Sequence, residues 1–215
     1  MQLETQFTPE RREHTSTTAK AGLLFVLSAP SGTGKDTVIN ALKEQGADFH
    51  VVASVTTRTP RPGESEGNPY HFVTVDQFQT MVKKDELIEH AQVHGNWYGQ
   101  PIQQIRENLQ KGRDVLLKID VQGAATVRQK LPGAIYIFLV PGSPEELVER
   151  LTNRQTETEQ ERQRRLEDAK QELAQRTHYD YTIVNRQGKL DETVENLRAI
   201  MQAEHCRTHL RMITI

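Results

Sequence analysis

The sequence predicts an α/β fold in which a parallel five-stranded core sheet is flanked by helices and carries an inserted mixed lobe and a helical lid. Apolar runs that suit strands buried on both faces alternate with segments of helical periodicity. A glycine-rich loop follows the first of these runs and leads into a helix, as at the opening of a βαβ unit. Two stretches, residues 55–111 and 154–177, interrupt the alternation and predict the lobe and the lid.

The core elements follow in order along the chain. The first strand is the apolar run 23–27, and a helix begins near Lys35 with Val38, Ile39 and Leu42 at helical spacing. Further strands are predicted at 115–119, 135–140 and 181–184, with helices at about 122–131 and 144–153. This order predicts a mostly parallel sheet with helices on both faces.

The two interruptions define the domain organisation. Turn-rich pieces between short strand-like runs predict the small lobe, whereas residues 154–177 are highly charged and bury only a thin stripe of Leu166, Ala169 and Leu173. A helix with so little to bury is a candidate mobile lid. We expect a disordered tail at 1–20, then one domain at 21–207, with core segments 21–54, 112–142 and 178–207, a lobe at 55–111 and a lid at 143–177.

Composition narrows the possible partners and the compartment. A net charge of −2, from 27 basic and 29 acidic residues, gives no reason to expect nucleic acid or an anionic membrane as partner. Cys206 is the single cysteine, so no internal disulfide forms, which fits a cytoplasmic protein. No run approaches the ~18 apolar residues of a membrane span, and the N-terminal stretch lacks the features of a signal or transit peptide. The oligomeric state stays open.

The loop after the first strand is suited to holding the phosphates of ATP. Gly32 and Gly34 allow backbone N–H groups to turn toward one anion, and the helix N-terminus adds a favourable dipole. Lys35 can reach the β- and γ-phosphates. A glycine turn with a solvated lysine is the alternative. The predicted ATP-binding residues are Ala29, Pro30, Ser31, Gly32, Thr33, Gly34, Lys35, Asp36 and Thr37.

Asp36 occupies the position where the phosphate-loop motif places a hydroxyl that holds Mg²⁺. A carboxylate beside a triphosphate is unfavourable unless a cation lies between them. Asp36 therefore either ligates Mg²⁺, directly or through water, or turns away toward Lys118. We expect Mg²⁺ to bind with ATP, and Asp36 and Thr37, the nearest hydroxyl, are its candidate ligands.

Polar side chains in the lobe can hold a second phosphate. Arg58 and Arg61 lie three residues apart in a predicted turn and can form a fork for one phosphate, to which the hydroxyl of Tyr70 can add a hydrogen bond. Taken alone, two arginines on a loop fit solvated side chains at least as well.

Six segments follow one another along the chain: Ser54, Thr56-Thr-Arg-Thr-Pro-Arg-Pro-Gly-Glu64, Tyr70-His-Phe72, Ile88-Glu-His-Ala-Gln-Val93, Gly95-Asn-Trp-Tyr-Gly99 and Asp120-Val-Gln-Gly123. They occur in the order and spacing that guanylate kinases show, and from about Gly22 to Ala203 the chain resembles this family of P-loop nucleoside monophosphate kinases. The resemblance implies ATP-dependent phosphorylation of GMP, and also of dGMP, in purine nucleotide metabolism.

The resemblance assigns roles by position. Glu89 would accept hydrogen bonds from guanine N1–H and N2–H₂, which adenine cannot donate in the same way. The other GMP-binding residues would be Ser54, Arg58, Arg61, Tyr70, Tyr98, Gly99, Gln100 and Asp120. Asn185 would lie near the adenine of ATP. The catalytic residues would be Lys35, Asp120 and the lid arginines Arg150, Arg154 and Arg165, which close on the transferring phosphoryl group.

Each assignment has a plain structural alternative. Glu89 could be a surface charge, Asp120 a helix cap and Asn185 a strand-end turn residue. The lid arginines could form solvated ion pairs.

The chain also departs from the family pattern. Gln100 replaces a small hydroxyl residue, and Lys118 replaces an acidic residue two before Asp120. Asp36 is an extra carboxylate at this site, and Lys118 stands where the family has one. We therefore hypothesise that Asp36 replaces the missing carboxylate from the other side of the metal ion.

Two other functions are possible. The Gly-Lys-Asp sequence resembles ribose bisphosphate phosphokinases, and inactive guanylate-kinase-like modules serve as interaction domains in membrane-associated scaffolds. The GMP-binding set argues against the first. Lys35 and the lid arginines argue against the second.

Overall fold

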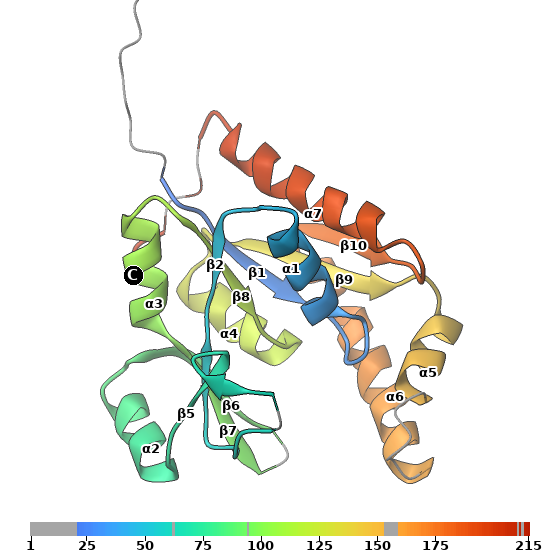
Figure 1. Ribbon diagram of the computed structural model, residues 1–215, viewed down its shortest axis with the longest axis horizontal. Helices are drawn as coiled ribbons and strands as arrows, with labels where there is room; N and C mark the ends of the chain where they lie inside the picture. The colour runs from blue at the N-terminus through green and yellow to red at the C-terminus, as the bar shows by residue number, and fades with distance from the viewer. Residues whose placement is uncertain (1–20, 62, 94, 153–158, 210, 212) are drawn as a thin grey trace, which may run out of the picture.

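The core of the protein is a five-stranded parallel sheet in the order β10-β9-β1-β8-β2 (Figure 1). The computed structural model describes residues 21–61, 63–93, 95–152, 159–209, 211 and 213–215, but not the side chains of 151, 152, 159–162 and 165. The expected tail at 1–20 lies outside these residues. The strands are β1 (Leu24–Ser28), β2 (Phe49–Val51), β8 (Asp114–Lys118), β9 (Ile135–Pro141) and β10 (Tyr181–Asn185).

Four of these strands match the predicted runs, whereas β2 had not been located. It has only three residues, Phe49, His50 and Val51, and lies at the edge of the sheet beside β8. A three-residue edge strand buries too little to produce a long apolar run, so its sequence carries no clear strand pattern.

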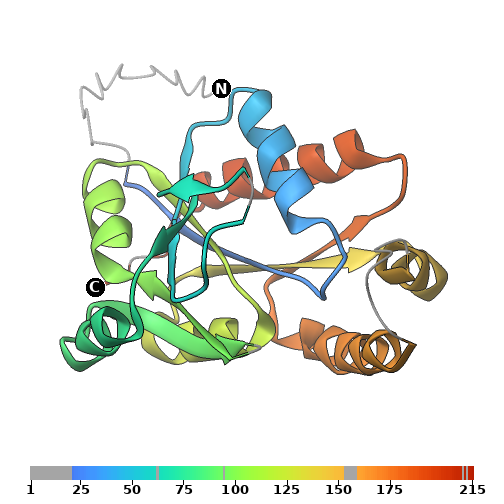
Figure 2. The same ribbon diagram turned by 60° about the horizontal axis from the view of Figure 1, so that its bottom comes forward.

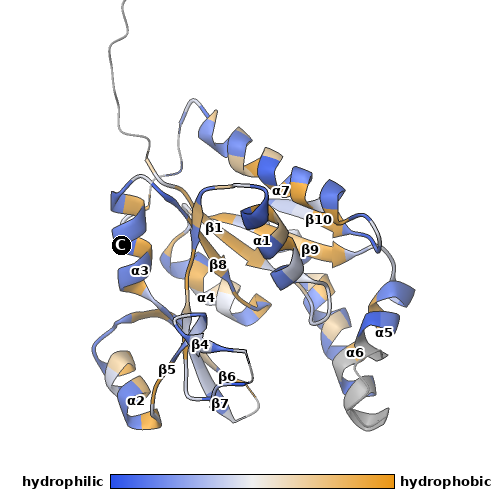
Figure 3. Cartoon of the chain, viewed as in Figure 1, coloured by the Kyte–Doolittle hydropathy of each residue, from blue (hydrophilic) through white to orange (hydrophobic). Residues whose placement is uncertain are grey.

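Helices cover both faces of this sheet. Successive side chains of a strand point to opposite faces, so alternate residues of β1 meet different helices. Phe25 and Leu27 pack with α1 (Lys35–Glu44) and α7 (Leu190–His205), whereas Leu24 and Val26 pack with α3 (Ile102–Gln110) and α4 (Val121–Lys130). Figure 3 shows the core strands as the most apolar part of the chain. No helix among the described residues is long and apolar enough to cross a membrane.

A second, mixed sheet forms the lobe. Its order is β4-β5-β3-β7-β6, with β3 parallel to β5 and antiparallel to β7, and α2 (Val75–Lys83) packs Phe78 against it. The strands are β3 (Ser54–Thr56), β4 (Ser65–Glu66), β5 (Pro69–Phe72), β6 (Leu87–Val93) and β7 (Asn96–Pro101). Gly99 is required by this packing, because a Cβ there would lie 2.6 Å from Leu87 Cδ1.

Both boundaries of the second sheet differ from the expected boundaries of the lobe. Ser54 was expected in the core, but it begins β3 of the second sheet. Helix α3 was expected in the lobe, but Ile105 is buried in the core cluster with Val115 and Leu117 of β8.

Two helices, α5 (Pro144–Thr152) and α6 (Glu159–Ala174), lie together beyond the ends of β9 and β10, and a 3₁₀ turn η1 (Gln175–His178) returns the chain to the sheet (Figure 2). The predicted apolar stripe is confirmed: Leu166, Ala169 and Leu173 pack against Leu147 of α5. This small cluster is separate from the two core clusters, as expected for a lid that buries little.

Candidate active site

The phosphate loop is formed where β1 ends and α1 begins, at the carboxyl edge of the parallel sheet. Gly32 and Gly34 have φ values of 82° and 92°, a left-handed conformation that favours glycine. Helix α1 then starts at Lys35, whose Nζ donates to the backbone oxygen of Ala29 over 2.6 Å. The loop therefore has the shape that the sequence predicted, and its lysine folds back over it.

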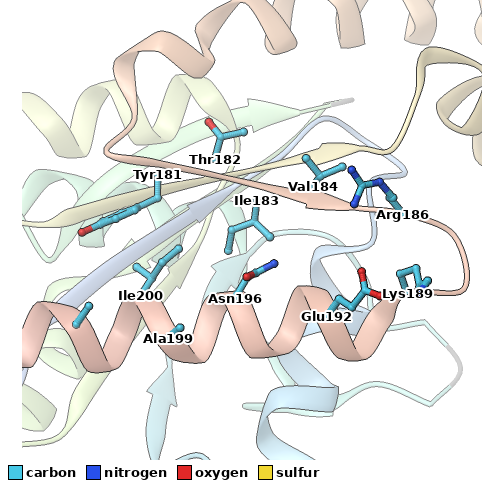
Figure 4. Close-up of a pocket in the computed structure, with 11 residues that line it drawn as sticks. Tyr181, Thr182, Ile183, Val184, Arg186, Lys189, Glu192, Asn196, Ala199 and Ile200 are labelled. Atoms are coloured by element: carbon cyan, nitrogen blue, oxygen red, sulfur yellow. Dashed lines mark hydrogen bonds and ion pairs between the residues drawn. The ribbon is translucent and has the colours of Figure 1, made fainter.

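A cavity of about 610 Å³ opens in front of this loop. Residues 30–37 form one side, and Arg150 of the lid and Asn185 at the end of β10 form another. The structure thus brings the predicted ATP-binding residues together with one of the lid arginines. A further hollow of about 490 Å³ lies between the β10 edge and α7 (Figure 4), and none of the described residues lining it is a predicted site residue.

Asn185 and Arg150 both hold the phosphate loop. The side-chain amide of Asn185 donates to the Thr33 carbonyl oxygen over 2.7 Å, and Arg150 Nη1 donates to the same oxygen over 3.2 Å. Asn185 is buried, and its own Oδ1 accepts from the Thr193 hydroxyl over 3.1 Å. Asn185, at the end of β10, therefore supports the loop as well as lining the cavity.

The Lys35 ammonium lies in a mixed electrostatic environment. Burial lowers its pKa, and Glu172, Asp36 and Asp120 act in the opposite direction. Glu172 reaches the loop from α6, and its Oε2 accepts from the Ser31 N–H over 3.3 Å. Sequence analysis missed Glu172, although its position three residues after Ala169 places it beside the apolar stripe of the lid helix.

Asp36 pairs with Lys118, one of the two alternatives predicted for it. Lys118 Nζ donates to Asp36 Oδ1 over 2.6 Å, and the Asp36 side chain is 74% exposed. Thr37 is also exposed. Within the described ranges, no three acidic, histidine or cysteine side chains gather as a preformed metal site.

The strand register of the second sheet gathers the predicted phosphate-binding side chains. Ser54 pairs with Tyr70 and Thr56 pairs with Tyr98, so both tyrosines flank β3. Their rings are 5.9 Å apart in an edge-to-face arrangement, and the Arg58 guanidinium lies 5.4 Å from the Tyr70 ring centroid. Side chains from three strands and a turn thus meet at one place.

Glu64 fixes the turn that carries both lobe arginines, a role that sequence analysis did not assign. Both of its carboxylate oxygens lie 2.9 Å from Arg58 Nη2, and Oε2 also accepts from the Arg61 N–H over 2.8 Å. The Arg61 side chain itself is exposed. Hydrogen bonds to Arg61 and Arg58 lower the pKa of Glu64.

Gln100 lies inside the lobe beside Ser54. Its Nε2 donates to Ser54 Oγ over 2.7 Å, while its buried Oε1 has no hydrogen-bond partner among the described residues. An unpaired buried acceptor is costly, so this oxygen is available to a donor from a ligand.

Glu89 is a buried carboxylate on β6, only 6% exposed, rather than a surface charge. Burial, with a smaller contribution from Asp120, raises its pKa to about 7. Gly123 of α4 gives it room, because a Cβ there would lie 3.1 Å from the carboxylate. Asp120 caps α4 by accepting from the Gly123 N–H over 2.7 Å, so its alternative role as a helix cap is confirmed.

The lid arginines can be placed only in part. Arg150 lies at the phosphate loop, as described above. Arg154 lies outside the described residues, and Arg165 lies on α6 with its side chain outside them.

Comparison with known proteins decides the family. The family model for guanylate kinase matches residues 22–204. The chain belongs to the guanylate kinase family. The guanylate kinase of Halalkalibacterium halodurans is 44% identical over 186 residues, covering 86% of this chain and 90% of the relative. That of Dechloromonas aromatica is 46% identical over 183 residues, covering 85% and 90%.

A solved guanylate kinase supports the same fold. The crystal structure of guanylate kinase from Anaplasma phagocytophilum aligns with a TM-score of 0.71 and 36% identity, over 88% of this chain and 89% of that chain. In the present chain, the phosphate loop lies on the core sheet and Glu89 on the lobe sheet, and the Asp120 carboxylate acts to raise the pKa of both Glu89 and, against the larger effect of burial, Lys35. The candidate site therefore combines residues from both sheets.

Proposed function

We propose that this protein is an ATP-dependent guanylate kinase that transfers the γ-phosphoryl group of ATP to GMP, giving ADP and GDP. The observation that carries the proposal is the pairing of a phosphate loop on one sheet with a buried carboxylate, Glu89, on the other. The phosphate loop would hold ATP, and Glu89 would select a base that presents two adjacent N–H hydrogen-bond donors. As a cytoplasmic enzyme of purine nucleotide metabolism, it would also accept dGMP.

The donor site neutralises the ATP phosphates. Residues 29–37 would supply backbone N–H groups, and Lys35 would leave the Ala29 carbonyl to contact the β- and γ-phosphates. Arg150 already reaches the loop from α5, and Arg154 and Arg165 would join it when the lid closes. Lid closure also excludes water, which favours transfer to GMP over hydrolysis.

Magnesium would arrive with ATP. The donor set fits an ion that keeps most of its ligands on phosphates and water, because no cluster of three ligands forms among the described residues. Asp36, whose carboxylate is mostly exposed, and Thr37 would hold it from the protein side. The ion would offset negative charge on the transferring phosphoryl group.

The acceptor site orients GMP. Ser54, Arg58, Arg61, Tyr70 and Tyr98 would bind its phosphate, and Glu89, Gln100 and Gly99 would surround the guanine. Asp120 would orient the acceptor between the two sheets. The phosphate of GMP is itself a competent nucleophile, so the protein needs no general base and works by positioning and charge neutralisation.

The parts that move are proposed from the packing. Residues 54–101 carry the second sheet and would move as the acceptor lobe, while α5 and α6 would move as the lid. The remainder, including α3, would stay with the core.

The test is a coupled assay of ADP release with purified protein, ATP and one acceptor at a time. We expect turnover with GMP and dGMP, and little with AMP or ribose 1,5-bisphosphate. Turnover with AMP equal to or faster than with GMP would refute the guanine assignment. Preference for ribose bisphosphate would indicate a sugar kinase, and no ADP release with any acceptor would indicate an interaction module.

A further inference from the structure

Lys118 lies where the donor and acceptor parts meet. It is the last residue of β8, paired in register with Leu27 at the end of β1, and its side chain is 18% exposed. Its Nζ is 2.6 Å from Asp36 Oδ1 on the phosphate-loop helix and 5.9 Å from the centroid of the Tyr70 ring on the lobe. One ammonium from the core sheet therefore contacts both the phosphate-loop helix and the lobe.

Two cations lie at one aromatic ring beside this position. Arg58 lies 5.4 Å from the centroid of the Tyr70 ring that Lys118 also approaches. Each cation is paired with a carboxylate, Arg58 with Glu64 and Lys118 with Asp36. A phosphate that entered beside Tyr70 would be close to both cations, which favours an anion there.

The present partner of Lys118 is easily replaced. Asp36 is 74% exposed, so water can solvate its carboxylate when the ion pair opens. A phosphate offers more charge and more acceptor oxygens than a carboxylate, and an ammonium can donate three hydrogen bonds. An incoming phosphate in reach of Lys118 would therefore compete well with Asp36.

We propose that Lys118 binds the phosphate of the acceptor nucleotide and exchanges Asp36 for it when that nucleotide enters. The inference rests on the proposed function, since it takes the acceptor to be a nucleoside monophosphate. Lys118 forms no covalent bond in this role. It neutralises charge on the phosphate whose oxygen attacks the donor, beside Arg58 and Tyr70.

The experiment compares ligands with and without the phosphate. GMP and guanosine are titrated calorimetrically into the wild-type protein, Lys118→Met and Lys84→Met, an exposed lysine of the lobe with the same charge change. Lys118→Met should weaken GMP binding about 10- to 100-fold, the effect of losing a charge-assisted hydrogen bond, and leave guanosine binding within about twofold. Lys84→Met should change neither, and Lys118→Arg should recover most of the GMP affinity.

Two other results of the titrations would overturn the proposed role of Lys118. An equal loss for GMP and guanosine would show that Lys118 only positions the lobe, and unchanged GMP binding would remove it from the acceptor site. In both cases wild-type turnover of GMP still supports the proposed function, whereas a wild type that neither binds nor phosphorylates GMP overturns both. If Lys118→Met fails to fold by circular dichroism, the same titrations with Lys118→Gln decide the question.

Discussion

Replacing Glu89 by glutamine should stabilise the ligand-free protein at pH 8 and weaken its binding of guanine. The carboxylate is 6% exposed, and burial raises its pKa from 4.5 to about 7. At about 1.4 kcal/mol per pKa unit, ionising this group costs the folded state at most about 3.5 kcal/mol above pH 7. Glutamine removes that cost but keeps a polar group to desolvate, so we expect a gain of about 1–3 kcal/mol.

The stability of the folded protein should depend on pH because the pKa of Glu89 differs between the folded and unfolded states. The folded protein binds the Glu89 proton more tightly than the unfolded chain does, so the free energy of unfolding decreases as pH rises from 4.5 to about 7. The advantage of Glu89→Gln should therefore be fully present above pH 7 and disappear below pH 4.5.

Guanine binding should change in the opposite direction. A carboxylate can accept from both N1–H and N2–H₂, whereas a glutamine amide must turn one N–H toward a guanine donor. Leaving that pair unsatisfied costs about 2–4 kcal/mol, roughly 30- to 1,000-fold in affinity. Guanosine binding to the wild type should also weaken below pH 7, up to about tenfold per pH unit, because the proton competes with the base.

Urea unfolding at pH 5 and pH 8 and calorimetric titration with guanosine measure these effects. Guanosine is the probe because it lacks a phosphate that titrates in the same range. Glu86→Gln, an exposed glutamate just before β6, is the matched control and should change neither quantity. A Glu89→Gln protein that is less stable than wild type at pH 8, or that binds guanosine equally well, would refute the assigned charge state and role.

Three further predictions concern the phosphates and the metal. Lys35→Ala should lower kcat roughly 10³-fold or more with an unchanged circular dichroism spectrum, because it removes a cation from the transferring group; activity within about tenfold would exclude that role. Arg58→Ala and Arg61→Ala should weaken GMP binding much more than ATP binding in calorimetry, since both belong to the acceptor lobe, and equal losses for the two nucleotides would contradict this. Asp36→Ser should raise the Mg²⁺ concentration needed for half-maximal rate by roughly three- to tenfold, since a neutral hydroxyl replaces a charged ligand, and an unchanged titration would remove Asp36 from the metal site.

The core could be predicted because its signals are local and strong. Runs such as 135–140 are apolar throughout, since helices cover both faces of the parallel sheet, and they match β9 closely. The phosphate loop was equally clear, because it needs glycine at the two positions of positive φ and a lysine at the helix start. The resemblance indicated the candidate acceptor residues, and strand register explains why Ser54, Tyr70 and Tyr98 lie close together.

Contacts between distant segments could not be predicted from the sequence. Glu172 reaches Ser31 across 141 positions of sequence, and nothing near either residue indicates the other. The Gln100 amide could be expected to face guanine, but its hydrogen bond to Ser54 depends on the packing of β3 against β7. The ion pair of Asp36 with Lys118 likewise depends on the pairing of β1 with β8, which brings α1 and Lys118 together.

Helix α4 joins the lobe to the core beside Glu89. Gly123 lies against the Glu89 carboxylate, and Lys130 Nζ donates to the Ile88 backbone oxygen over 2.6 Å, so both ends of the helix touch β6. Strand β6 is one edge of the lobe sheet, whereas β5, which carries Tyr70, lies next to the opposite edge. If the lobe movement proposed above is a rotation about this seam, Glu89 would hardly move and Tyr70 would move much further. The base could then be recognised at any degree of opening, and only its phosphate would have to move toward the donor.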